Sequence, residues 1–395
     1  MSASPSFFEC FKSYRAFNRL PEAFRQVVFY SEGKTYWPFL RPLIDGLLRK
    51  TELSLTYISS ETDDPGLTCH PERVRGLVIG KGLFRSFLFA NMNAKTLLMT
   101  LPELDVYHVK RSVVAPVYYI YLMHGVDSLH AGLPERSFDH YDALFCVGKH
   151  QVEEARQREK LAQLPAKRLA ETGYPYLDDL IAEAQNVSAP YAGDRAIRVV
   201  IAPTWSREGT GILENFGKAL VQTLLDAGIE VTVRPHSQTW RFHPQCLEAL
   251  RAAFSEHPHF TLETTTTDKR SLMNADVLIG DWGSAPLEFA FGRLRPVLFF
   301  DTPMRVMNPN YRELGIEPFE VRIRGKLGEV LRPDEIEKAP EAIRRLTENL
   351  PERIALLESL RNDSFFQIGR SVDTSIDELL AILNEQTRRE NKTGE

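Results

Sequence analysis

The sequence is poor in cysteine, in net charge and in long apolar runs, and each shortage excludes a class of protein. Its four cysteines lie far apart and include no C-x-x-C pair, so neither a disulfide framework nor a zinc ribbon is indicated, which fits a reducing cytosol. With 48 basic and 53 acidic residues the net charge is −5, which argues against a nucleic-acid partner. The longest apolar run, residues 113–123, contains a proline and is much shorter than the roughly 20 residues of a membrane-spanning helix. We expect this run to form a buried strand.

Several motifs with known chemistry are also missing. No G-x-x-x-x-G-K-[ST], G-x-S-x-G or early G-x-G-x-x-G is present, so P-loop nucleotide hydrolysis, serine hydrolysis and ordinary NAD chemistry lose support. His130, His140 and His150 are spaced too widely for zinc ligands, and we expect no metal or cofactor. The N-terminus has no signal-peptide pattern, which predicts a cytoplasmic protein.

What the sequence does contain is an alternation of short apolar runs with helix-like stretches. Strands are predicted at residues 26–30, 53–59, 76–80, 96–100, 117–123 and 143–148, and again at 197–202, 230–234, 276–280 and 295–300. Helices are predicted at residues 37–50, 150–164, 212–227, 285–291, 340–349, 351–362 and 375–389. Strands that alternate with helices imply parallel sheets covered on both faces.

A polar stretch at residues 186–196, with proline and glycine and no periodicity, reads as a linker between two such patterns. We therefore predict two doubly wound, Rossmann-like domains that face each other across a cleft. The first spans residues 1–190 and the second 191–365, and residues 366–395 form a C-terminal helix and frayed tail.

Open α/β sheets bind ligands at the carboxyl ends of their strands, so the residues that follow each predicted strand are the candidates for a site. Four strand ends in the two domains carry small, hydroxyl, cationic or imidazole groups. These candidates are His124, Gly125, Val126, Asp127 and Ser128; Pro203, Thr204 and Trp205; Arg234, Pro235 and His236; and Asp281, Gly283, Ser284 and Glu288.

Arg234, His236 and the helix that starts at Gly283-Ser284 suit a diphosphate. Arginine offers paired N–H donors, an imidazolium adds another charge-assisted bond, and a helix start presents free N–H groups to an anion. Each feature also has an ordinary structural explanation: a surface ion pair, a turn cap and an N-cap serine. Glu288, one turn further on, either accepts bonds from ligand hydroxyls or is a solvated first-turn carboxylate.

His124 is the candidate general base. It follows a predicted strand and precedes Gly125, which allows the backbone to turn sharply and present the imidazole at the sheet edge. A histidine is the usual side chain for taking a proton from a hydroxyl near neutral pH, although a lone histidine is more often structural.

The N-terminal residues 7–25 interleave aromatic side chains with lysine and arginine. An aromatic stripe with cations beside it suits a membrane interface. The alternative is a helix that packs on the first sheet with its charges in water.

Taken in order, these strand-end motifs resemble the CDP-glycerol glycerophosphotransferase family, which builds teichoic-acid and related capsule polymers. The resemblance covers roughly residues 117–320. His124-Gly125 is similar to the family's HG loop, residues 173–175 to its GYP turn, residues 202–205 to APTW, residues 234–236 to RPH, and residues 276–289 to its DVLITDYSS…FD stretch.

This resemblance implies a GT-B fold with an acceptor-side first domain and a CDP-donor-binding second domain. It implies transfer of glycerol phosphate, or a related polyol phosphate, from a CDP-activated donor to a hydroxyl of a lipid-linked acceptor or growing polymer, at the inner face of the cell membrane. His124 is the implied base. His236 is the second implied catalytic residue, because with Arg234 and the helix start at Gly283-Ser284 it would hold the diphosphate and stabilise charge on the leaving CMP. The other strand-end residues are implied to hold the donor.

Three motifs depart from the family pattern and leave the polyol, the acceptor and the polymer length open. Tyr176 follows the GYP turn in place of arginine, Gly283 stands for one of two serines, and the HG loop continues as Val126-Asp127-Ser128. Two other functions remain open: a nucleotide-sugar glycosyltransferase or epimerase of the same fold, and a non-catalytic nucleotide-binding module.

Overall fold

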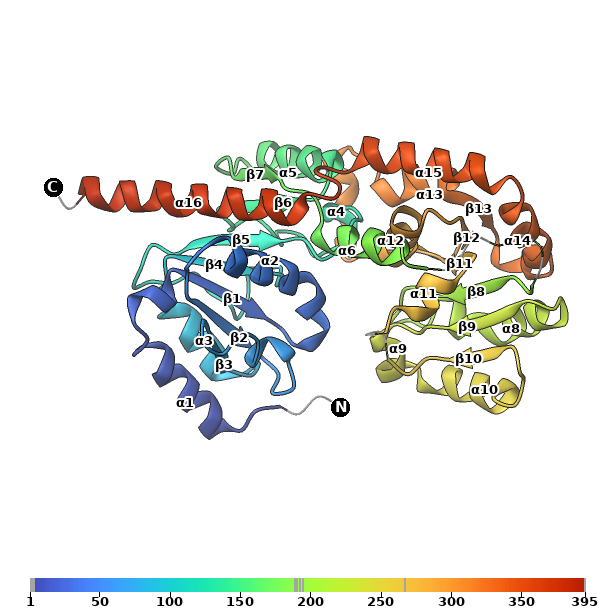
Figure 1. Ribbon diagram of the computed structural model, residues 1–395, viewed down its shortest axis with the longest axis horizontal. Helices are drawn as coiled ribbons and strands as arrows, with labels where there is room; N and C mark the ends of the chain where they lie inside the picture. The colour runs from blue at the N-terminus through green and yellow to red at the C-terminus, as the bar shows by residue number, and fades with distance from the viewer. Residues whose placement is uncertain (1–3, 188–190, 192, 194, 266–267, 394–395) are drawn as a thin grey trace. The chain divides into compact units, whose positions relative to one another are not determined.

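The computed structural model describes residues 4–187, 191, 193, 195–265 and 268–393 and divides the chain into two compact units (Figure 1). Unit 1 consists of Met1–His124, Leu133–Tyr176 and Phe365–Glu395. Unit 2 consists of Gly125–Gly132 and Leu177–Ser364. Each unit is built on one parallel sheet with helices packed against it, so the predicted α/β class is confirmed.

The sheet of unit 1 has seven strands in the order β3-β2-β1-β4-β5-β6-β7, and all neighbours pair in parallel. The strands are β1 Val27–Ser31, β2 Leu55–Ser59, β3 Val74–Val78, β4 Thr96–Met99, β5 Tyr118–Leu122, β6 Ala143–Cys146 and β7 Arg168–Glu171. Strands β1, β2, β4 and β6 are buried at every position. Their continuous apolar character is what a strand covered on both faces requires.

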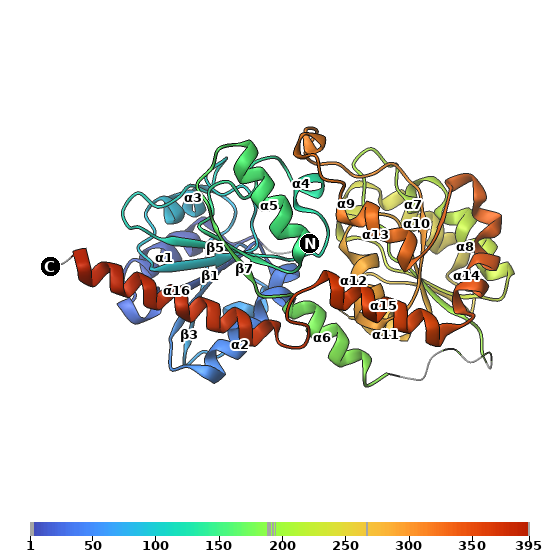
Figure 2. The same cartoon turned by 90° about the horizontal axis from the view of Figure 1, so that it is seen from above.

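The helices of unit 1 come from both ends of the chain. They are α1 Phe7–Phe17, α2 Trp37–Lys50, α3 Leu83–Ala90, α5 Lys149–Leu161 and α16 Ser371–Thr393, with short 3-10 turns η1 Glu22–Arg25, η2 Lys34–Tyr36 and η3 Pro65–Leu67. Helix α16 lies along α2 in both views (Figures 1 and 2). A Cβ atom at Gly46 of α2 would lie 2.6 Å from Val372 Cγ1, so glycine is needed for the two helices to approach this closely.

The sheet of unit 2 has six strands in the order β10-β9-β8-β11-β12-β13, again all parallel. The strands are β8 Arg198–Ile201, β9 Glu230–Val233, β10 Phe260–Leu262, β11 Val277–Gly280, β12 Val297–Phe300 and β13 Gly328–Leu331. The helices are α4 Leu129–Gly132, α6 Pro175–Ala184, α7 Ile212–Asn215, α8 Gly217–Asp226, α9 Ser237–Phe242, α10 Pro244–Phe254, α11 Arg270–Asn274, α12 Ser284–Arg293, α13 Phe319–Leu327, α14 Ala339–Thr347 and α15 Leu350–Ser364, with 3-10 turns η4 Tyr311–Leu314 and η5 Pro333–Lys338.

The division of the chain differs from the expected one in two places. Residues 366–395 are not a separate appendage, because α16 buries Ile376 and Leu379 in the core of unit 1. The first change of unit comes at His124–Gly125, well before the linker expected at 186–196, of which residues 188–190, 192 and 194 lie outside the described part. The strand expected within residues 113–123 forms only at its second half, and Val113 is 83% exposed.

Candidate active site

The carboxyl end of β5 places His124 at the edge of the unit 1 sheet, half-buried among aromatic rings. Its Nδ1 lies 3.0 Å from the Tyr121 hydroxyl, and the Tyr36 ring packs edge-on with its centroid 5.5 Å away. Burial lowers the pKa of His124 to about 4, so the imidazole is neutral at neutral pH. If Nδ1–H donates to Tyr121, Nε2 has a free lone pair, which is the tautomer that a general base needs.

Tyr176 belongs to the same aromatic cluster of unit 1. Its ring packs on Phe39 with centroids 5.0 Å apart, and Phe39 in turn lies 6.0 Å from the His124 ring. The position that carries an arginine in the family pattern is therefore occupied by an aromatic side chain packed against other rings.

The four residues that follow His124 belong to unit 2, where they wrap around the start of α12. The Val126 N–H donates to Ser284 Oγ at 3.0 Å, and Ser284 Oγ donates to the Asp127 carboxylate. A Cβ atom at Gly125 would lie 2.5 Å from Ser284 Oγ and 2.7 Å from Asp127 Oδ1, so a larger residue would have to displace these two side chains. Gly283, the N-cap of α12, has φ +86°, a backbone conformation that also favours glycine.

Glu320, on α13, is a member of this cluster that the sequence did not indicate. It is buried and accepts the Ser128 N–H at 3.0 Å, while Ser128 Oγ accepts the Phe319 N–H at 2.5 Å. Burial, together with the charge of Asp127, raises the pKa of Glu320 to about 7. No motif signals Glu320, since it lies almost 200 residues from the loop that it holds.

A stack of side chains forms the candidate nucleotide site of unit 2, centred on Trp205 after β8. The indole stacks on Phe242 at 5.3 Å and on the His236 ring at 6.1 Å, and the Arg305 guanidinium lies 4.9 Å from the indole. His236 Nδ1 accepts the Gln238 N–H at 3.1 Å at the start of α9, so Nε2 carries the proton and donates outward. Loss of water around the ring, and then the charge of Arg305, lower the pKa of His236.

Arg305 is the second functional candidate that the sequence did not indicate. It follows β12 in a segment without glycine or motif residues, and only the fold brings it to Trp205. Within the described part of the chain it forms no ion pair within 4.0 Å, and its Nη2 donates to the Met307 sulfur at 3.4 Å. Burial lowers the pKa of Arg305, whereas Asp127 and Glu208 raise it, so a cation is held here without a close counter-ion.

Arg234 and Asp281, by contrast, form buried hydrogen bonds with other residues of the protein. Arg234 is 7% exposed and donates to Glu263 Oε2 and to the Asp268 carbonyl, both at 2.6 Å. Asp281 is 2% exposed and accepts the N–H groups of Thr204 and Trp282 at 2.8 Å and the Thr302 hydroxyl at 3.2 Å. Both side chains order the loops that carry other candidates, and their contact with a ligand stays a prediction.

The remaining candidates line the same strand ends of unit 2. Pro203 and Pro235 are buried in the turns after β8 and β9, and Thr204 and Glu288 are half-buried. Among the described residues, no group of three or more His, Cys, Asp or Glu side chains is arranged to hold a metal ion.

Replacing Asp281 tests its ordering role. Asp281→Ala leaves three donors without their acceptor and is expected to lower the free energy of unfolding by about 3 kcal/mol, measured by urea denaturation. Burial raises the pKa of Asp281 from 3.8 to about 6, so the stability due to the protonated carboxyl is fully present below about pH 3.8 and is lost as the pH rises through about 6. Asp281→Asn should therefore gain stability relative to the wild type between pH 5 and pH 8. If the difference in unfolding free energy between the two proteins stays constant over this pH range, the assignment is contradicted.

Comparisons with known proteins place this geometry in context. The family model described as CDP-Glycerol:Poly(glycerophosphate) glycerophosphotransferase matches residues 93–312, a range that includes His124, the Trp205 stack and the start of α12. The solved structure of the wall teichoic acid polymerase TagF is similar over 95% of this chain and 94% of that chain, with 15% identity and a TM-score of 0.58. A search of curated proteins found no match.

Two epimerases of known structure match with TM-scores close to that of TagF. The UDP-GlcNAc 2-epimerases from Methanocaldococcus jannaschii and Neisseria meningitidis match 90% of this chain and 99% of theirs, with 14% and 13% identity and TM-scores of 0.57 and 0.58. At these identities the likeness concerns the fold, which is of the GT-B type predicted from the sequence.

Proposed function

Because the chain belongs to the CDP-glycerol:poly(glycerophosphate) glycerophosphotransferase family, we propose that it transfers glycerol phosphate, or a related polyol phosphate, from a CDP-activated donor to a hydroxyl acceptor. The acceptor is a glycan, a lipid-linked glycan or a growing polymer, and the product is a teichoic-acid-like or capsule polymer. The observation that carries the donor assignment is the Trp205 stack, which brings His236 and the uncompensated Arg305 together.

In the proposed reaction the acceptor oxygen attacks the β-phosphorus of the donor, and the bond from that phosphorus to the bridging oxygen breaks, so that CMP leaves. His124 takes the proton from the acceptor hydroxyl, a role that fits its neutral state and its Tyr121 contact. Protein groups do little covalent chemistry in phosphoryl transfer and act mainly by positioning and by stabilising charge.

The donor is held by groups of unit 2. Arg305 offers a planar pair of N–H donors to a diphosphate, and His236 donates through Nε2–H as a neutral ring. Thr204 and Trp205 border the nucleotide, and Glu288 accepts hydroxyls of the donor. Ser284 Oγ and the first N–H groups of α12 complete the site. For this, a phosphate oxygen replaces the Asp127 carboxylate as the acceptor of the Ser284 hydroxyl.

Ligand-induced stabilisation tests the donor class. We expect CMP and one of CDP-glycerol or CDP-ribitol to raise the melting temperature, because a ligand that binds only the folded state stabilises it. A shift with UDP-GlcNAc or GDP-mannose alone would favour the epimerase or glycosyltransferase alternative, which the fold also supports. A shift with a CDP-polyol but no CMP release with any acceptor would indicate a non-catalytic binding module.

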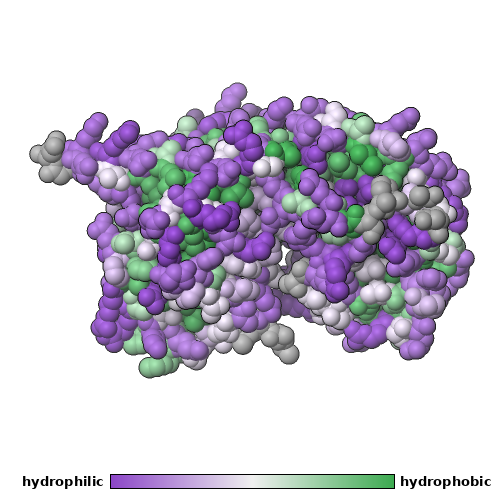
Figure 3. Space-filling view, in the orientation of Figure 1, coloured by the Kyte–Doolittle hydropathy of each residue, from purple (hydrophilic) through white to green (hydrophobic). Residues whose placement is uncertain are grey.

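Helix α1 supports a peripheral contact with the cell membrane. Phe7 and Phe8 are 74% and 72% exposed, and Lys12, Arg15 and Arg19 lie exposed on the same segment. Figure 3 shows green, hydrophobic side chains at the surface over α1 with purple, hydrophilic ones around them. None of the helices in the described part of the chain has both the length and the apolar character needed to cross a bilayer.

Co-sedimentation with vesicles tests this contact. We expect the protein to bind vesicles rich in anionic lipid and the double variant Phe7→Ser, Phe8→Ser to lose most of that binding, because both phenyl rings would enter the interface. The variant should fold normally, since both rings are solvent-exposed. Equal binding by the variant, or equal binding to neutral vesicles, would contradict a contact made by these rings and cations.

A further inference from the structure

The loop that joins β3 to α3 in unit 1 has features of an anion site that the proposed donor site does not use. It reads Gly80-Lys81-Gly82 and lies at the carboxyl end of β3, the sheet edge that also carries His124 after β5. Gly80 turns the chain with φ +68°. Gly82 caps α3 without a side-chain hydrogen bond, and a Cβ atom there would meet nothing within 4 Å, so the helix start is open.

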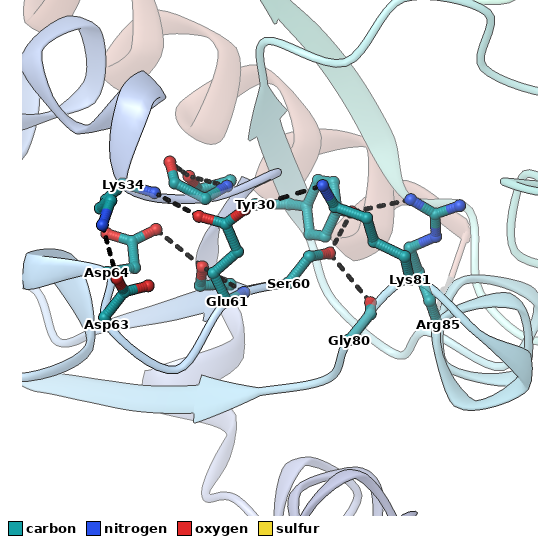
Figure 4. A network of polar contacts seen from close by, with 12 residues as sticks. Tyr30, Lys34, Ser60, Glu61, Asp63, Asp64, Gly80, Lys81 and Arg85 are labelled. Atoms are coloured by element: carbon teal, nitrogen blue, oxygen red, sulfur yellow. Dashed lines mark hydrogen bonds and ion pairs between the residues drawn. The ribbon is translucent and has the colours of Figure 1, made fainter. Parts of the chain in front are cut away.

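Arg85, in the first turn of α3, is held on one side by a relay of neutral groups (Figure 4). Its Nη1 donates to the Tyr30 hydroxyl at 3.3 Å, Tyr30 lies 2.8 Å from Ser60 Oγ, and Ser60 Oγ donates to the Gly80 carbonyl at 2.9 Å. Because the Ser60 proton goes to Gly80, Tyr30 is the donor to Ser60. Burial raises the pKa of Tyr30, so the relay orients the guanidinium without neutralising its charge.

The positive charge of Arg85 has no close counter-ion. Arg85 forms no ion pair within 4.0 Å among the described residues, and its buried Nε has no hydrogen-bond partner. Lys81 reaches Glu61 only at 3.8 Å, and its side chain is 59% exposed. A buried donor or charge without a partner is costly, which points to an anion as the missing component.

Besides Glu61, the carboxyl group of Glu32, which follows β1, interacts electrostatically with Lys81 and Arg85. Burial raises the pKa of Glu32, and Lys81 and Arg85 oppose this rise from a distance. The loop thus brings two cations, Lys81 and Arg85, to the start of α3, and neither forms an ion pair shorter than 3.8 Å among the described residues.

We infer that Lys81, Arg85 and the start of α3 bind a phosphate group of the acceptor. This inference rests on the proposed function, because it assumes that the acceptor hydroxyl is attached to a phosphate monoester or diester. The half-buried Arg85 guanidinium, the Lys81 ammonium and the first N–H groups of α3 are donors from three sources, a set suited to a tetrahedral anion. The donor diphosphate is assigned to unit 2, so the two anions use separate groups.

Titration calorimetry with sn-glycerol 3-phosphate and with inorganic phosphate, on the full chain with CDP present to fill the donor site, tests the inference. We expect Arg85→Gln and Lys81→Ala each to weaken the binding of glycerol 3-phosphate by about tenfold or more, since each removes a charge-assisted hydrogen bond. The matched control, Lys160→Ala on the exposed side of α5, should bind as the wild type does. If inorganic phosphate also binds, and both variants weaken its binding to the same degree, the site recognises the phosphate group alone.

Two outcomes would overturn the site: no binding of glycerol 3-phosphate by the wild type, or binding that neither variant weakens. Lys81 is solvent-exposed, so Lys81→Ala decides the question even if Arg85→Gln fails to fold. A parallel titration with CDP-glycerol reports on the proposed function separately. Loss of glycerol 3-phosphate binding in both variants without any CDP-glycerol affinity in the wild type would contradict the donor assignment and leave the phosphate site standing.

Discussion

His124→Ala is expected to lower the rate of polyol phosphate transfer by about 10³-fold, the scale of a lost general base. The affinity for the CDP-activated donor should change little, because the proposed donor contacts lie in unit 2 while the His124 side chain packs among rings of unit 1. Single-turnover release of CMP, with donor binding measured on the same preparation, separates the two effects. His108→Ala, at an exposed position of unit 1, is the matched control.

The pH dependence gives a second test of the base. Because burial lowers the pKa of His124 to about 4, the base stays deprotonated throughout the neutral range. The transfer rate should therefore be flat on its acidic side down to about pH 5 and fall only as the pH approaches 4. A rate that falls through pH 6.5, or a His124→Ala variant that loses donor binding and keeps its rate, would contradict the assignment.

Arg305→Ala is expected to raise the KM for the donor by about 10-fold to 100-fold, since it removes a charged hydrogen-bonding group worth roughly 1.5–3 kcal/mol. Arg305→Lys should recover only part of this loss, because an ammonium keeps the charge but not the planar contact with Trp205. Initial rates at varied donor concentration measure the effect, with Lys218→Ala on the exposed face of α8 as the control.

The same experiment distinguishes Arg305 from Arg234. Arg234 is paired with Glu263 in the interior, so Arg234→Ala leaves a partly buried carboxylate without its partner. Its main effect should be a lower melting temperature, while Arg305→Ala should melt near the wild type. If Arg305→Ala instead destabilises the fold and leaves the donor KM unchanged, Arg305 is a structural residue.

The sequence predicted the central strands well because each is a short apolar run. β2, β4, β5 and β6 fall within the predicted runs and β1 extends one residue beyond its run, at strands where burial on both faces demands continuous hydrophobicity. The three short edge strands β7, β10 and β13 were not predicted. Each has one neighbour only, and their partly exposed residues give no continuous apolar run.

The strand-end motifs could be found in the sequence, but the partners of their side chains could not. Asp281 looks like a ligand contact when only the neighbouring Gly283 and Ser284 are considered, yet the fold gives its oxygens to Thr204 and Thr302. Arg305 and Glu320 carry no local signal. Their candidacy comes from burial and from contacts across long stretches of chain, which single-sequence patterns do not encode.

The return of α16 to unit 1 has a consequence for the order in which the chain folds during synthesis. Ile376, Leu379 and Ile382 of this helix are fully or almost fully buried in the core of unit 1 and cover α2. The main segment of unit 2, Leu177–Ser364, is made after most of unit 1. All residues of unit 2 nevertheless leave the ribosome before α16 does. Unit 1 must then wait, with the apolar face of α2 uncovered, until α16 is made. A nascent chain stalled just short of α16 should accordingly be protease-resistant in its later half and sensitive in its earlier one.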